Sequence, residues 1–278
     1  MERTHSLDAA GEAPLDATTA QPSSLRGRVA LVTGAAGDLG RGIAGALAAR
    51  EAIVLCADIR STADLVDTLP GGRGRELALD VTDPGEVERV FARVRDDHGR
   101  LDILVNNAGL AHPPAPLADT SDAVIDRVLD VNVKGVLHCA RAAARVMIGT
   151  SSGRIINIAS QAGKCGVANW AVYCASKAAV IAATQAQALE LAPYGITVNA
   201  ICPGPMLTEM TSETARLEAA ARGADVEVLL EEQRRAVPLG RFGTAAEMGE
   251  MVAWIASDAS SFTTGASFNL TGGMSVFF

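Results

Sequence analysis

The sequence predicts an α/β fold built on one doubly wound parallel sheet with helices on both faces. Short apolar runs, typical of buried strands, alternate with longer stretches whose apolar residues recur at helical spacing. The first apolar run ends in a glycine-rich turn, and a helical stretch follows it directly. Strands that alternate with helices form βαβ units, and such units assemble into parallel sheets.

The order of the elements follows from this alternation. Strands are expected at 28–34, 52–60, 101–109, 153–160, 196–204 and 267–273, and helices at 39–50, 83–99, 121–147 and 171–195. Asp83 is expected to cap the second of these helices, with Pro84 at its first position. Composition does not change within residues 26–278, which predicts a single Rossmann-like domain.

Two segments depart from this rhythm. Residues 1–25 mix acidic and small residues with Pro and Ser and show no period, so we expect a disordered N-terminal tail. Residues 206–236, approximately, are helical in composition but richly charged, and they follow the end of a strand. Because ligands bind beyond the carboxyl ends of such strands, this insertion predicts a small, mobile helical lid over the substrate; an inert pair of surface helices is the alternative.

Composition disfavours several classes of protein. The net charge of −8 argues against nucleic acid as a partner. No apolar run reaches the roughly 20 residues of a membrane helix, so no membrane association is expected. The five cysteines include no C-x-x-C pair, which predicts buried, reduced thiols and a cytoplasmic protein. The four histidines show no metal-ligand spacing, so no metal site is expected.

The stretch "LVTGAAGDLGRGIA", residues 31–44, predicts a phosphate-binding turn. Glycines let the backbone approach a pyrophosphate, and the helix N-terminus offers free N–H groups. The next strand ends in Asp58, where an acid can bond the ribose hydroxyls of NAD and repel the 2′-phosphate of NADP. Arg60 offers that phosphate a partner, but we expect Asp58 to dominate, so NAD is expected and NADP is less favoured. Alternatively, Asp58 is an ordinary polar residue at a strand end.

Seven motifs in register make residues 26–275 resemble the short-chain dehydrogenase/reductase family. They are "TGAAGDLG" (33–40), "LDVTD" (79–83), "NNAG" (106–109), "VNVKG" (131–135), Ser160, the Tyr173–Lys177 pair and "CPGPMLT" (202–208). The resemblance implies a catalytic set of Asn132, Ser160, Tyr173 and Lys177. It implies cofactor contacts from Gly34, Asp38, Leu39, Gly40, Asp58, Ile59, Asp80, Val81, Asn107, Ala108, Gly109, Tyr173, Lys177, Pro203, Gly204, Met206 and Thr208.

Asp38 is the one departure from the family pattern TG-x-x-x-G-x-G, because it occupies the position of the middle glycine. A carboxylate beside the pyrophosphate is unfavourable if it points inward. We therefore expect its side chain to point outward or to cap a helix.

The proposed chemistry rests on Tyr173 and Lys177, which lie one helical turn apart. A nearby ammonium favours the phenolate, so the pKa of Tyr173 is expected to fall from its usual value near 10. Tyr173 would then exchange a proton with the substrate, while Ser160 stabilises the substrate oxygen. The resemblance implies that Lys177 also holds the nicotinamide ribose and that Asn132 anchors a water of the proton relay. Taken alone, the tyrosine–lysine pair would fit simple packing with a snorkelling lysine.

The substrate is expected to contact Ser160, Gln161, Trp170 and Tyr173, although Gln161 and Trp170 would equally suit backbone bonding and packing. This polar and apolar mixture suits a small alcohol or ketone: a diol, polyol or hydroxyketone. "SQAGK", "VYCASKAAVI" and "GGMSVF" are similar to acetoin/2,3-butanediol and sorbitol-type dehydrogenases. The alternatives are a 3-oxoacyl thioester reductase and a catalytically silent nucleotide-binding regulator.

The family usually forms tetramers. The chain ends in "SFNLTGGMSVFF", whose apolar residues would be unusual on the surface of a monomer. A homotetramer is expected, with a dimer as the alternative.

Overall fold

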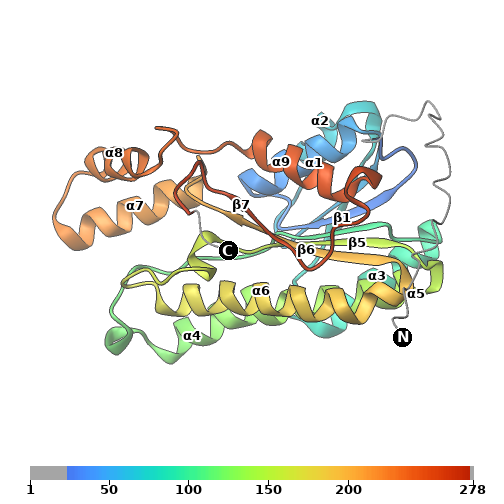
Figure 1. Ribbon diagram of the computed structural model, residues 1–278, viewed down its shortest axis with the longest axis horizontal. Coiled ribbons are helices and arrows are strands. Elements are labelled where there is room, and N and C mark those ends of the chain that lie inside the picture. Colours follow the sequence, from blue (N-terminus) through green and yellow to red (C-terminus); the bar gives the residue numbers. More distant parts are fainter. Residues whose placement is uncertain (1–23, 276–278) are drawn as a thin grey trace, which may run out of the picture.

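The computed structural model describes residues 24–275 and has a seven-stranded parallel sheet at its centre (Figure 1). The strand order is β3-β2-β1-β4-β5-β6-β7. The strands are β1 (Val29–Thr33), β2 (Ile53–Asp58), β3 (Gly74–Ala78), β4 (Ile103–Asn106), β5 (Gly153–Ile158), β6 (Ile196–Pro203) and β7 (Ser267–Leu270). This is the doubly wound Rossmann-like α/β sheet that the sequence predicts.

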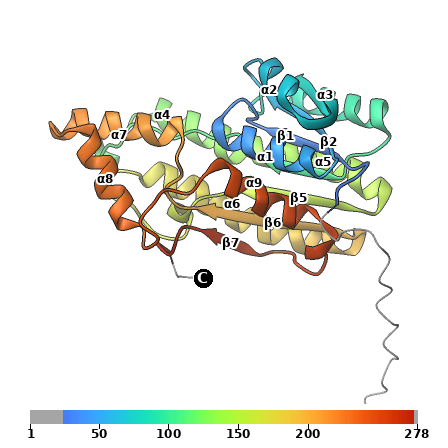
Figure 2. The same cartoon turned by 90° about the horizontal axis from the view of Figure 1, so that it is seen from above.

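Helices cover both faces of the sheet. One layer holds α1 (Asp38–Ala49), α2 (Ala63–Thr68) and α9 (Ala245–Ala256), and the other holds α3 (Pro84–His98), α4 (Asp122–Leu129), α5 (Val136–Thr150) and α6 (Ala171–Leu191). In both views α7 (Glu209–Arg222) and α8 (Val226–Ala236) project beyond one end of the sheet (Figures 1 and 2). The segment predicted to be a lid thus forms two helices, and its covering role stays a prediction.

Each strand supplies residues to two cores because successive side chains point to opposite faces. In β1, Ala30 and Val32 belong to the cluster shared with α1 and α9, whereas Leu31 belongs to the cluster shared with α3 and α5. Strands buried on both faces read as continuous apolar runs, which is why this part of the sheet was predictable.

Helices α1 and α9 approach so closely that glycine is required at the contact. A Cβ added to Gly42 would collide with the backbone carbonyl of Ala245, and one added to Gly249 would collide with that of Gly42. This contact closes the helical layer above the glycine-rich turn.

Several predicted boundaries differ from the structure. β3, α2 and α9 were not predicted; β3 is an edge strand with the sequence GRELA and several exposed residues, so it lacks the apolar run of a central strand. The helix predicted at 121–147 is α4 and α5, joined by a π-helical segment at Asp130–Gly135. The predicted cap of α3 is confirmed, since Asp83 accepts the N–H groups of Gly85 and Glu86.

The folded domain begins earlier than expected, because Leu25 is fully buried in the core. The rest of the predicted tail, 1–23, lies outside the described residues, as do the last three residues of the apolar C-terminus. Cys56, Cys139 and Cys202 are buried, whereas Cys165 is exposed and Cys174 half-buried. Within residues 24–275, no helix has the length and apolar character needed to span a membrane, and no three His, Cys, Asp or Glu side chains gather as metal ligands would.

Candidate active site

The candidate site lies at the carboxyl ends of the strands, around the point where the strand order reverses between β1 and β4. β1 ends at Thr33, β4 at Asn106, β5 at Ile158 and β6 at Pro203. The expected site residues lie at these ends, at the ends of β2 and β3, or on the helices that pack behind them. The topology therefore brings together residues that are far apart in the sequence.

The glycine-rich turn packs closely against the segment that follows β4. Gly34 has φ of 65°, in the left-handed region, and a Cβ there would lie 2.8 Å from the Cα of Ala108. A Cβ on Gly40 would collide with the carbonyl oxygen of Gly34. The side-chain amide of Asn107 donates to the carbonyls of Thr33 and Gly34, at 3.0 Å each. The bare backbone at the start of α1 is the cradle that a pyrophosphate requires.

Asp38 is the first residue of α1, yet its carboxylate is directed at a different helix. Its Oδ2 accepts the backbone N–H of Glu209, the first residue of α7, at 2.7 Å. The side chain therefore takes the capping role that the sequence suggested, but on the lid instead of on its own helix.

Asp58 is held rigidly beside the turn and is only 7% exposed. Its Oδ2 accepts the N–H of Ala36 at 3.0 Å, and its Oδ1 accepts the N–H of Arg60 at 2.9 Å. The Arg60 side chain is largely exposed, with Nε 3.6 Å from Oδ1. Ile59 is 75% exposed beside them. Each carboxylate oxygen keeps a lone pair for a ribose hydroxyl.

Asp80 and Val81 follow β3. Asp80 Oδ1 accepts the N–H and the hydroxyl of Thr82, at 2.9 and 2.7 Å, which fixes the turn. Val81 is buried, and Leu39 packs against the core beneath the turn. The adenine contact implied for Asp80 and Val81 stays a prediction.

The segment after β6 leads from the sheet into the lid. Pro203 ends β6, and the N–H of Gly204 donates to the carbonyl of Leu270 at 3.0 Å. Met206 forms an isolated parallel bridge with Gly243. Thr208 caps α7, its Oγ1 accepting the N–H of Thr211. The expected nicotinamide loop is thus pinned at both ends.

Asn132 lies in the π-helical segment between α4 and α5 and is fully buried. Its amide pairs with Leu110 in both directions, at 2.9 Å each, and donates to Ser176 Oγ at 3.1 Å. Such π segments often occur at functional sites. Ser176 also donates to the carbonyl of Tyr173 at 2.7 Å. The sequence reasoning missed Ser176, whose only signal was its place between the tyrosine and the lysine.

Ser160, Tyr173 and Lys177 meet where β5 ends beside α6. Lys177 Nζ donates to the carbonyl of Ile158 at 3.0 Å and lies 5.8 Å from the centroid of the Tyr173 ring. Ser160 hydrogen-bonds to the Tyr173 side chain, and its Oγ accepts the N–H of Ala162 at 3.1 Å.

Asn132 and Lys177 both lie next to Gly109. A Cβ added to Gly109 would lie 3.3 Å from both Asn132 Oδ1 and Lys177 Nζ. All four expected catalytic side chains therefore lie in one place.

Burial dominates the protonation of this cluster. Desolvation raises the pKa of Tyr173, and the hydrogen bond from Ser160 offsets only part of that rise. Desolvation lowers the pKa of Lys177 to about 8. The expected fall in the pKa of Tyr173 is therefore wrong for the protein alone. The Lys177 ammonium bonds the carbonyl of Ile158, and the half-buried phenol of Tyr173 is partly desolvated.

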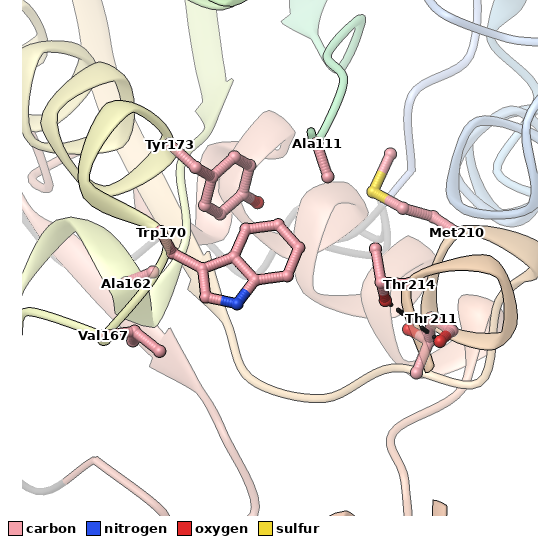
Figure 3. Close-up of a pocket in the computed structure, with 8 residues that line it drawn as sticks. All are labelled: Ala111, Ala162, Val167, Trp170, Tyr173, Met210, Thr211 and Thr214. Atoms are coloured by element: carbon pink, nitrogen blue, oxygen red, sulfur yellow. Dashed lines mark hydrogen bonds between the residues drawn. The ribbon is translucent and has the colours of Figure 1, made fainter. Parts of the chain in front are cut away.

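A cavity of about 210 Å³ opens in front of Tyr173 (Figure 3). Trp170 and Tyr173 form one wall, and Met210, Thr211 and Thr214 of α7 face them from the lid. Ala111, Ala162 and Val167 complete the lining. The lid segment and the stretch before Tyr173 thus supply most of this cavity, as the sequence predicts, whereas Ala111 was not anticipated.

Of the four residues expected to contact the substrate, Trp170 and Tyr173 line this cavity, whereas Ser160 and Gln161 do not. The amide nitrogen of Gln161 lies 3.3 Å from the sulfur of Met274, and its oxygen accepts the hydroxyl of Ser275 at 3.2 Å. His112, which the sequence did not single out, lies behind Trp170 with its ring centroid 5.2 Å away. Its Nδ1 bonds the carbonyl of Pro113 at 2.7 Å. Gln161 thus braces the C-terminal segment, and His112 supports the tryptophan wall.

Comparison with known proteins decides the family. A sequence model described as Enoyl-(Acyl carrier protein) reductase matches residues 34–275. Galactitol 2-dehydrogenase from Agrobacterium fabrum is 38% identical over 257 residues, which cover 90% of this chain and 98% of that protein. The chain belongs to the short-chain dehydrogenase/reductase family.

Two further relatives show the range of this similarity. The 3-oxoacyl-(acyl-carrier-protein) reductase FabG from Haemophilus influenzae is 34% identical over 255 residues, covering 90% of this chain and 99% of that one. The solved structure of levodione reductase superposes with a TM-score of 0.86 at 30% identity, covering 91% of this chain and 99% of that one. Relatives of this short-chain dehydrogenase/reductase therefore include both polyol dehydrogenases and 3-oxoacyl reductases.

The residues present fit a nicotinamide dinucleotide. The glycine cradle at Gly34 and Gly40 leaves no room for a side chain, and Asp58 holds its carboxylate oxygens beside that cradle, where the family resemblance implies a ribose. The protein is accordingly an oxidoreductase of the EC 1.1.1 type that acts on CH–OH groups with NAD or NADP. This assignment replaces the alternative of a catalytically silent regulator.

Proposed function

We propose that this enzyme interconverts a secondary alcohol and a ketone on a small diol, polyol or hydroxyketone, with NAD as the preferred cofactor. The observation that carries the proposal is the cavity in front of Tyr173. Its volume of about 210 Å³ falls below the roughly 300–1,000 Å³ of pockets for drug-sized ligands. Thr211 and Thr214 of α7 already donate their hydroxyl protons to backbone carbonyls, so their oxygens can accept hydrogen bonds from a substrate hydroxyl. Together with the Tyr173 phenol, they suit a compact substrate with more than one oxygen.

Tyr173 is the proposed proton donor to the substrate oxygen in ketone reduction and the acceptor in alcohol oxidation. Its raised pKa keeps the phenol protonated at neutral pH, the form needed for reduction. Ser160, hydrogen-bonded to Tyr173, is proposed to stabilise the charge that develops on the substrate oxygen. The bound nicotinamide supplies or accepts the hydride.

Lys177 and Asn132 are proposed to return the proton. The pKa of about 8 lets Lys177 gain and lose a proton near neutral pH. Lys177 Nζ and Asn132 Oδ1 both lie 3.3 Å from the position of a Cβ on Gly109, and a water that hydrogen-bonds to both is proposed to complete the relay. Lys177 is also proposed to hold the nicotinamide ribose.

Reduction of a 3-oxoacyl thioester is a second candidate, because the FabG relative matches the chain as fully as the polyol dehydrogenase does. An acidic acyl carrier protein needs a basic surface near the entrance. On the lid, however, Arg222 pairs with Glu218, and Arg234 and Arg235 both pair with Glu231. Arg216 of α7 adds a positive charge outside these pairs, so the small cavity is the observation that favours the small-substrate proposal.

A screen of diols, polyols, hydroxyketones and 3-oxoacyl thioesters, followed through NADH absorbance, tests the proposal. We expect the highest kcat/KM among the diols, polyols and hydroxyketones. A higher kcat/KM for the thioesters would instead support the second candidate.

A further inference from the structure

Asp38, the residue that departs from the family pattern, hydrogen-bonds to Glu209, which lies 171 residues later in the sequence. The carboxylate of Asp38 leaves the glycine-rich turn and accepts the backbone N–H of Glu209 at 2.7 Å. Two parts of the site that lie on different elements are thereby joined: the turn expected to hold the pyrophosphate and the helix that covers the substrate.

The N-terminus of α7 has an N–H group free for such a bond. The first four N–H groups of a helix have no partner within it. Thr208 caps the helix by accepting the N–H of Thr211, which leaves the N–H of Glu209 for another acceptor. A carboxylate at this position also interacts favourably with the helix dipole.

Backbone contacts with Gly243 hold the segment before α7 to the body. Before the helix, Met206 bridges to Gly243, and the N–H of Leu207 donates to the carbonyl of Gly243 at 2.8 Å. Beyond it, α7 and α8 project away from the sheet (Figure 2). The bond from Asp38 therefore acts where the lid leaves the body, and a small change of angle there moves the whole helix.

The cavity wall begins immediately after this bond. Met210 and Thr211 follow Glu209 within the first turn of α7, and Thr214 lies one turn beyond Thr211; all three face Trp170 across the cavity (Figure 3). The position of this wall depends on the angle at which α7 starts.

We propose that Asp38 is a positioning residue that ties the lid helix to the dinucleotide turn and so sets the far wall of the substrate cavity. The bond also draws the carboxylate toward the positive end of α7, which limits its repulsion of the pyrophosphate. This proposal does not depend on which substrate the enzyme takes.

Amide hydrogen exchange across α7, with and without NADH, tests the tie through two independent changes. Asp38→Ala removes the acceptor. Glu209→Pro removes the donated N–H together with the glutamate side chain, and proline is well tolerated at the first position of a helix. For both, exchange of the amides from Ser212 to Ala219 is expected to be about 3- to 10-fold faster, the scale of a lost helix cap. The double variant is expected to exchange no faster than either single variant, since both remove one bond.

Matched variants separate the tie from general damage. Asp38→Asn keeps an acceptor oxygen and Glu209→Ala keeps the N–H, so both are expected to protect α7 as the wild type does. Asp225→Ala removes the cap of α8, where Asp225 accepts the N–H of Glu227 at 2.8 Å, and is expected to loosen α8 alone. Wild-type exchange in Glu209→Pro, or additive effects in the double variant, would overturn the proposal.

Kinetics with the best substrate from the screen give the functional readout. Asp38→Ala and Glu209→Pro are expected to raise the substrate KM about 3- to 10-fold with kcat within about twofold. The affinity of Glu209→Pro for NADH, from fluorescence titration, is expected to stay within about threefold of wild type. An unchanged KM in both variants would contradict the positioning role. If the screen yields no substrate, the proposed function fails, but hydrogen exchange still tests the bond between Asp38 and α7, because that experiment needs no substrate.

Discussion

Burial of the Lys177 side chain costs the folded protein stability while its amine is charged. This burial lowers the pKa of Lys177 to about 8 from an ordinary value of 10.5. The folded state therefore binds fewer protons than the unfolded state between about pH 8 and pH 10.5. The free energy of unfolding therefore rises as pH rises from about 8 to 10.5, because the buried amine loses its charge. Below pH 8 the amine is charged, and the protein bears the whole desolvation cost of burying it.

Lys177→Met should thus stabilise the protein while abolishing turnover. At pH 7 the free energy of unfolding is expected to rise by about 1–3 kcal/mol, because an apolar side chain of similar length carries no desolvation penalty but loses the bond to Ile158. The gain should shrink between pH 8 and pH 10.5. Denaturant unfolding of wild type and variant at several pH values measures this gain. A variant less stable than wild type at pH 7 would contradict a desolvation cost at Lys177.

Asp58 is the residue on which cofactor choice is proposed to depend. Wild type is expected to prefer NADH, since the fixed carboxylate repels a 2′-phosphate, and Asp58→Ser should shift the preference toward NADPH by at least about tenfold because Arg60 is left nearby. The ratio of kcat/KM for the two cofactors is the measurement. A tenfold preference of the wild type for NADPH would overturn the assignment.

At the scale of the element, glycines of one helix have opposite roles. Gly42 meets the backbone of α9, whereas the position of a Cβ on Gly45, also in α1, has no atom within 4 Å. Gly42→Ala is expected to destabilise the protein by about 1–3 kcal/mol through overpacking. Gly45→Ala is expected to stabilise it by up to about 1 kcal/mol through helix propensity. Thermal unfolding of the pair tests the contact, and equal effects would contradict it.

Helices and strands could be predicted where the local sequence pattern matches the burial of the residues in the folded protein. The central strands and the cap of α3 follow from apolar runs and from the Asp83–Pro84 pair. β3 was missed because Arg75 and Glu76 of this edge strand face solvent, and the π segment because its residues suit a regular helix. The bond from Asp38 to α7 could not be predicted, since no local pattern encodes a contact between residues 171 positions apart.

For the whole molecule, we propose a homotetramer. Phe262 is fully exposed, Leu189 is 80% exposed, and Trp254 on α9 is 40% exposed while its ring packs edge-on against Phe268. Apolar side chains of this size on α6, α9 and the segment before β7 suit contact with other copies. Light scattering is expected to give four times the 28.6 kDa chain mass, and a monomer mass would contradict the proposal.

The site as a whole was predictable from motifs in register, whereas its protonation was not. The sequence brings Asn132, Ser160, Tyr173 and Lys177 together, and the structure places them in one cluster beside one cavity. The direction of the pKa shift of Tyr173 depends on burial, which spacing along a helix does not reveal.

Turnover and cofactor binding measured together in Tyr173→Phe test whether this phenol exchanges the proton. We expect the affinity for NADH to stay within about threefold of wild type, because the ring and its packing remain. We expect kcat to fall by at least about 10²-fold, the usual contribution of general acid–base catalysis. Activity within a few-fold of wild type would show that another group moves the proton.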